Sequence, residues 1–115
     1  MVSILFIITG DPRTSPRPAE AIRIAAGVGS WGKVEVSIYL RGEAILTLGE
    51  DGNDLVDGEE LPRYWGIVGG WNRPVRVQAG AELMDGLGEP VLRIQEITDH
   101  ELARLAAEQR YVLRF

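Results

Sequence analysis

A short loop near the amino terminus carries the side chains best suited to bind a ligand. The segment Thr9-Gly10-Asp11-Pro12-Arg13-Thr14-Ser15-Pro16-Arg17 lies between an apolar run and a helical pattern. It combines hydroxyl groups, guanidinium groups and the free backbone amides of a helix start. Helix amino termini attract phosphate and carboxylate groups, and arginine adds bidentate donors. We therefore predict a site for a small anion, formed by Thr9, Gly10, Asp11, Arg13, Thr14, Ser15 and Arg17.

The same loop also allows a purely structural interpretation. Asp11-Pro12 is a turn sequence, Thr14 or Ser15 can cap the following helix, and the arginines can be solvated. The loop has neither the glycine spacing of a dinucleotide site nor the Gly-Lys-Ser/Thr of a P-loop, so a nucleotide is not specifically indicated.

The elements around this loop predict an α/β fold. The run from Val2 to Ile8 is almost entirely apolar, which is typical of a central parallel strand covered on both faces. Further strands are expected at 33–40, 74–78, 91–94 and 111–115, and helices at about 15–32, 57–71 and 98–106, with short helical stretches at 42–48 and 79–85. This alternation predicts one domain over 1–115, a three-layer α/β/α sandwich whose mostly parallel sheet has about five strands.

Two possible capping boxes mark helix starts. Thr98 can accept a hydrogen bond from the Glu101 amide while the Glu101 side chain reaches back, and Asp57 with Glu60 has a similar spacing. His100, the sole histidine, falls inside the first box, where we expect an exposed residue of the helix start rather than a catalyst. In the second helix Tyr64, Trp65 and Trp71 have the spacing of core residues, although a pocket or interface is an alternative.

Composition excludes several classes of function. The 115 residues carry a formal charge of −5, and their basic residues are interspersed with carboxylates, which disfavours a nucleic-acid partner. The chain has no cysteine, which removes disulfides, thiolate metal sites and thiol nucleophiles. The amino terminus has no basic flank and is too short for a signal peptide or membrane span, so we expect no membrane partner and a cytoplasmic location.

No metal site or cofactor is predicted. The acidic segment Asp51-Gly52-Asn53-Asp54 begins like a calcium loop, but Leu55 and Val56 occupy positions that need an oxygen ligand and the turn glycine. We interpret residues 49–58 as a surface loop.

The order of these segments resembles the DsrE/DsrF-like family of small α/β proteins. The resemblance is strongest in Gly10-Asp11-Pro12-Arg13-Thr14-Ser15-Pro16-Arg17 with the helix after it, and in Val34-Glu35-Val36-Ser37-Ile38-Tyr39-Leu40-Arg41-Gly42. Family members that carry sulfur use a cysteine just after the third strand. The corresponding segment here is Val75-Arg76-Val77-Gln78-Ala79-Gly80, in which Gln78 stands at the cysteine's position. An amide is neither a nucleophile nor a sulfur acceptor, so the resemblance implies the fold without covalent sulfur transfer.

The expected function is therefore a noncatalytic DsrE-like domain. Gln78 ends a strand at the same edge as the loop and joins the predicted ligand site. Ile24, Val28 and Trp31 widen the apolar face of the first helix beyond what one sheet covers, which predicts a homo-oligomer. Two alternatives remain: an accessory subunit of a sulfur-relay assembly, bound to a cysteine-bearing paralogue, or an enzyme with Asp11 as general base and Arg13 as oxyanion stabiliser.

Overall fold

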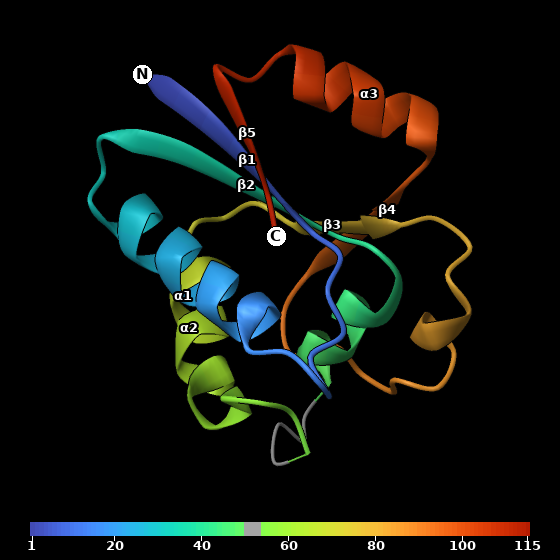
Figure 1. The fold of residues 1–115 in the computed structure, drawn as a ribbon. Helices are drawn as coiled ribbons and strands as arrows, with labels where there is room; N and C mark the ends of the chain where they lie inside the picture. Colours follow the sequence, from blue (N-terminus) through green and yellow to red (C-terminus); the bar gives the residue numbers. More distant parts are fainter. Residues whose placement is uncertain (50–53) are drawn as a thin grey trace.

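A parallel sheet of five strands organises the chain (Figure 1). The computed structural model describes residues 1–49 and 54–115. The strand order is β4-β3-β2-β1-β5, and each neighbouring pair is parallel. The strands are β1 (Val2–Ile8), β2 (Val34–Leu40), β3 (Val75–Gln78), β4 (Ile94–Ile97) and β5 (Tyr111–Arg114).

Helices cover both faces of the sheet, which confirms the predicted three-layer α/β/α sandwich. One face carries α1 (Arg17–Ser30) and α2 (Leu61–Gly69), and the opposite face carries α3 (Asp99–Ala107), as Figure 1 shows. Three short 3₁₀ helices complete the fold: η1 (Gly42–Leu48), η2 (Gly58–Glu60) and η3 (Glu82–Met84). No helix in the described part of the chain has the length and apolar character needed to cross a membrane.

The side chains of β1 alternate between two cores of unequal size. Phe6 and Ile8 belong to the large core under α1 and α2, whereas Leu5 and Ile7 belong to a small core under α3. All four are buried, which explains why this strand is a continuous apolar run. Among the described residues, the small core has two further buried side chains, Tyr39 and Ile97.

One predicted strand and one predicted helix cap were wrong. The fourth strand is Ile94–Ile97 rather than 91–94, because Val75 at the start of β3 pairs with Ile94. The polar residues that follow are tolerated there, since β4 lies at the sheet edge and can expose them to water. Asp57 forms no capping box: its backbone is left-handed, with φ of 56°, and η2 separates it from the start of α2.

The capping box predicted at the start of α3 is confirmed. Thr98 accepts from the Glu101 N–H at 3.2 Å, and the Glu101 carboxylate accepts from the Thr98 N–H at 2.9 Å.

The cap predicted for the first helix at Thr14 or Ser15 was wrong. α1 begins at Arg17, Pro16 occupies the cap position, and no side chain caps the helix. The Ser15 hydroxyl lies one residue before the cap, where it accepts from the Arg17 N–H at 3.1 Å.

Helix α1 closely approaches the segment that follows α2, at a glycine. A Cβ atom on Gly29 would lie 2.2 Å from the Trp71 ring, so only glycine allows this indole to rest against α1. Gly27, on the same helix, has nothing within 4 Å of its ideal Cβ position. The two glycines thus have opposite roles within one turn of helix.

This contrast gives a matched pair of substitutions. Gly29→Ala is expected to lower the free energy of unfolding by about 1–3 kcal/mol, because it overpacks the contact with Trp71. Gly27→Ala should raise it by about 0.5–1 kcal/mol through helix propensity alone. Urea unfolding of both variants measures the difference, and equal effects would contradict the packing assigned to Gly29.

Candidate functional site

The carboxyl ends of the three central strands bring the predicted ligand residues to one edge of the sheet. Ile8 and Leu40 are partners in the β1–β2 register, so Thr9 and Arg41 leave the sheet at the same level. Gln78 is the last residue of β3, beside β2. Open α/β sheets bind their ligands at this edge. We therefore take it as the candidate site.

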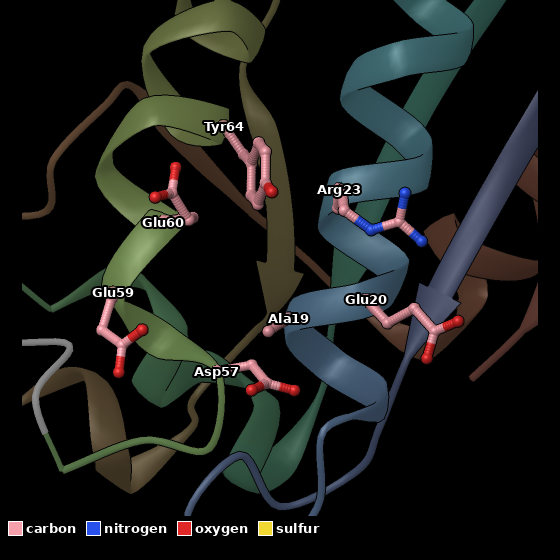
Figure 2. Close-up of a pocket in the computed structure, with 7 residues that line it drawn as sticks. All are labelled: Ala19, Glu20, Arg23, Asp57, Glu59, Glu60 and Tyr64. Carbon is pink, nitrogen blue, oxygen red and sulfur yellow. The ribbon is translucent and has the colours of Figure 1, made fainter.

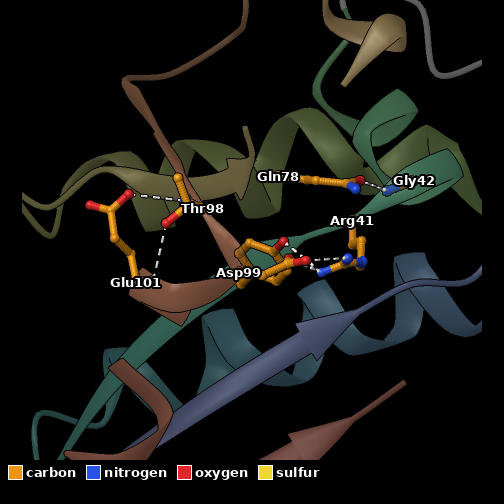
Figure 3. A network of polar contacts seen from close by, with 7 residues as sticks. Arg41, Gly42, Gln78, Thr98, Asp99 and Glu101 are labelled. Atoms are coloured by element: carbon orange, nitrogen blue, oxygen red, sulfur yellow. Dashed lines mark hydrogen bonds and ion pairs between the residues drawn. The ribbon is translucent and has the colours of Figure 1, made fainter. Parts of the chain in front are cut away.

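An arginine that the sequence analysis did not single out occupies the middle of this edge (Figure 3). The Arg41 guanidinium donates to both carboxylate oxygens of Asp99, at 2.8 and 3.3 Å, and to the Tyr39 hydroxyl at 3.2 Å. Asp99 is the first residue of α3, so this bidentate pair joins the end of β2 to the helix that covers the small core.

The pKa values of this cluster follow from its contacts. The hydrogen bonds and charge of Arg41 lower the pKa of Asp99 below its ordinary value, and Asp99 in turn raises the pKa of Arg41. Burial raises the pKa of Tyr39, with Arg41 opposing the rise. At neutral pH the cluster therefore holds one guanidinium, one carboxylate and a neutral phenol.

Gln78 points into the start of η1. Its side-chain oxygen accepts a hydrogen bond from the Gly42 N–H at 3.1 Å (Figure 3). Gly42 has φ of +59°, a left-handed conformation that favours glycine and turns its N–H toward β3. The position at which the family resemblance expects a cysteine is thus filled by an amide that accepts a backbone hydrogen bond.

On the α1 side of the edge, Arg13 lies between two carboxylates. Its guanidinium donates to both oxygens of Asp11, each at 3.0 Å, and to the Glu43 carboxylate at 2.9 Å. These contacts with Arg13 lower the pKa of Asp11. The Asp11 carbonyl also accepts from the N–H groups of Thr14 and Ser15, so the segment is the turn that its sequence indicates.

Thr9 and Arg17 lie toward β5 instead. The N–H and hydroxyl of Thr9 donate to the Phe115 carbonyl oxygen, at 2.8 and 3.3 Å. The Arg17 guanidinium carbon lies 5.8 Å from the centre of the Phe115 ring, a cation–π arrangement. At Gly10 a Cβ would approach Pro18 to 3.2 Å. The predicted residues therefore form three separate groups. Asp11 and Arg13 lie beside Glu43, Thr9 and Arg17 lie beside Phe115, and Gln78 lies beside Gly42.

Two cavities flank the edge and differ in charge. The cavity on the α3 side, here named the α3 cavity, has a volume of about 380 Å³ and an apolar floor that includes Ile7, Leu102 and Ala106. Its polar groups are the Thr9 hydroxyl, the guanidinium groups of Arg41 and Arg114, and the Asp99 carboxylate. The cavity on the α1 side is about 540 Å³ and contains Arg13 with two carboxylates, Asp54 and Glu89. An anion is therefore favoured on the α3 side.

A further pocket lies away from this edge, between α1 and α2 (Figure 2). Its volume is about 300 Å³, and it contains one arginine, Arg23, with Tyr64 and four acidic side chains, Glu20, Asp57, Glu59 and Glu60. This charge disfavours an anion, and none of the predicted ligand residues lines the pocket.

The other residues singled out from the sequence have structural surroundings. Trp65 is buried in the large core, and its indole N–H donates to the Thr47 carbonyl at 2.8 Å. His100 is exposed on the first turn of α3. Residues 50–53 of the acidic segment lie outside the described residues, and the remainder shows no group of three or more His, Asp or Glu side chains that could hold a metal.

Sequence reasoning missed Arg41, Asp99 and Arg114. Arg41 follows a buried strand directly, as the predicted loop does, and this signal would have identified it. Asp99 was recognised only as part of a helix cap, and Arg114 only as part of a strand. Their common cavity depends on the placement of α3 over β1 and β5.

Comparison with known proteins identifies the fold. Among solved structures, the chain is similar to the ychN protein from E. coli, with a TM-score of 0.80 and 21% sequence identity over 100% of both chains. At this identity the likeness shows the fold alone. No family model matches the sequence. No curated protein matches it either.

The Arg41–Asp99 pair makes a testable prediction about titration. Arg41→Gln should raise the pKa of Asp99 toward its ordinary value, because the guanidinium that stabilises the carboxylate is removed. Since the folded pKa is depressed, the stabilising contribution of this pair is present above the unfolded pKa and is lost as the pH falls through the folded one. Carboxyl-carbon NMR titration of Asp99 measures the change; Arg63→Gln, remote from Asp99, is the control. An Asp99 midpoint that is the same in both variants would contradict the assignment.

Proposed function

We propose that this chain is a noncatalytic binding domain that takes a small organic anion at the carboxyl edge of its sheet. The observation that carries the proposal is Gln78, whose amide oxygen accepts from the Gly42 N–H where the family resemblance places a sulfur-carrying cysteine. The whole chain contains no cysteine. Covalent sulfur transfer therefore has no nucleophile here, and the edge retains only binding groups.

The charge distribution supports the α3 cavity as the place where the anion binds. The two positive charges of Arg41 and Arg114 outnumber the single negative charge of Asp99. An apolar floor is supplied by Ile7, Leu102 and Ala106. A ligand with one carboxylate and a small hydrocarbon body matches both features. Thr9, from the predicted loop, lines the same cavity.

Apart from Thr9, the predicted loop lies outside the α3 cavity. Arg13 is held by Asp11 and Glu43, so an anion that binds there has to displace one of these carboxylates. The same contacts argue against acid–base catalysis by Asp11. A carboxylate with a lowered pKa is a weak base, and Arg13 occupies both of its oxygens.

Self-association is the second part of the proposal, and exposed apolar side chains support it. Trp31 at the end of α1 is 69% exposed, and Tyr111 and Leu113 on β5 are 52% and 40% exposed. Ile24 and Val28, by contrast, pack against the large core. β5 is also an edge strand, which leaves one side of its backbone without a strand partner. A second copy of the chain, or a cysteine-bearing paralogue in a sulfur-relay assembly, would cover this surface.

Anion binding can be tested with benzoate as the probe and benzyl alcohol as the neutral control. Benzoate should raise the Tm, and Arg114→Gln should weaken its binding by about tenfold, which corresponds to one lost hydrogen bond to a charged group. Arg41→Gln should act in the same direction, whereas Arg13→Gln should leave binding unchanged. Loss of binding in Arg13→Gln alone would move the site to the α1 side, and no benzoate effect on the wild type would overturn the proposal.

Self-association is tested by sedimentation velocity at micromolar concentration. The wild type should sediment as an oligomer, and Trp31→Gln with Leu113→Gln should shift it toward monomer. Ile67→Gln is the matched control, since Ile67 is an exposed apolar residue of α2, 38% accessible, outside the surface defined by α1 and β5. Only monomer in the wild type would reject self-association. Native mass spectrometry of protein purified from its source then separates a second copy from a paralogue.

A further inference from the structure

A small cavity at the opposite edge of the sheet is lined by two arginines. It lies where β3 and β4 begin and has a volume of about 190 Å³; Gly69, Asn72, Arg73, Leu92 and Arg93 line it. Val75 and Ile94 are the first partners in the parallel register, and the Val75 N–H donates to the Arg93 carbonyl oxygen at 3.1 Å, so Arg73 and Arg93 both lie within two residues of this pair. Among the described residues no carboxylate lines this cavity, although the chain as a whole is acidic. We name it the arginine cavity.

The two guanidinium groups are held in place by their neighbours. Arg93 donates from Nη2 to the Asn72 carbonyl at 3.0 Å, and Asn72 has φ of +63°, in the left-handed region. The Arg73 guanidinium carbon lies 5.8 Å from the centre of the Trp71 ring. Trp71 in turn rests against Gly29 of α1. Side chains anchored in this way lose little freedom when they bind a ligand.

One buried donor in this cluster has only an ion-pair partner. Nη1 of Arg73 is buried, yet it makes no hydrogen bond within the described part of the chain. It lies 3.1 Å from a carboxylate oxygen of Glu35, close enough for an ion pair but without the alignment of a hydrogen bond. The N–H groups of Nη1 are therefore available to an oxygen acceptor that approaches in better alignment.

Glu35 leaves room for that acceptor. Its side chain is 55% exposed and does not line the arginine cavity, so it can turn into solvent without opening the core. An anion in the cavity would then receive hydrogen bonds from Arg73 and Arg93 together, and arginine binds phosphate or carboxylate oxygens through paired N–H groups.

We propose that the arginine cavity binds a tetrahedral oxyanion, either free phosphate or the phosphoryl group of a small metabolite. The volume admits one such group, and the two guanidinium groups supply its positive surroundings. This site is at the amino ends of β3 and β4, whereas the proposed organic-anion site is at the carboxyl ends of the strands. The two sites share no residue, so each proposal can be tested independently of the other.

The test is a titration with inorganic phosphate at fixed pH and ionic strength, followed by amide NMR. Saturable shifts are expected at Asn72, Arg73 and Arg93. Arg93→Gln and Arg73→Gln should each weaken phosphate binding by at least about tenfold. The matched control is Arg63→Gln, which removes the same charge from an exposed arginine of α2 that does not line the cavity.

Glu35→Gln distinguishes a binding site from a structural ion pair. If the cavity binds phosphate, this change should tighten binding, because it removes the carboxylate that competes for Arg73. Glycerol 3-phosphate, used in a parallel titration, separates the two ligand sources: binding identifies a phosphoryl group, and phosphate binding alone identifies the free ion. Shifts that do not saturate, or that persist in both arginine variants, would overturn the proposal.

Discussion

The parallel pairing of β1 with its two neighbours is the constraint on which the rest of the structure depends. Beyond the strand ends the backbone pairing continues: the Arg41 N–H donates to Ile8 at 3.0 Å, and the Thr9 N–H donates to Phe115 at 2.8 Å. These bonds end three strands at a common level. The loops that follow therefore start at the same level, so their side chains are brought to one edge of the sheet before their own contacts form.

The two faces of the sheet are stabilised in different ways. The face under α1 and α2 is held by a large apolar core, whereas α3 contributes no fully buried side chain. Polar contacts compensate at the start of α3, where the Thr98 capping box and the Arg41–Asp99 pair lie on consecutive residues. Because α3 packs no fully buried side chain against the sheet, space remains beside it for the α3 cavity, with its guanidinium groups and apolar floor.

The sequence was a good guide wherever local patterns decide the structure. The apolar run of β1, the short helical stretch at 42–48 and the α3 capping box depend on neighbours along the chain, and all three were predicted. The start of β4 depends on pairing with β3, and for this reason the predicted start was three residues too early. Likewise, Asp11 could be recognised as a partner for Arg13 from their spacing, but Glu43 and Asp99 reach their arginines across 30 and 58 residues. Only the topology brings such pairs together.

The position of β5 beside β1 has a consequence for how the protein is made. β1 precedes the other strands of this sheet along the chain, and it acquires its second neighbour only when residues 111–114 become available. Until then the emerging chain presents the apolar side chains of β1 along an open backbone edge, a template for pairing with other chains. The sheet is thus completed only after residues 111–114 have been synthesised, and β5 removes an edge that could otherwise pair wrongly.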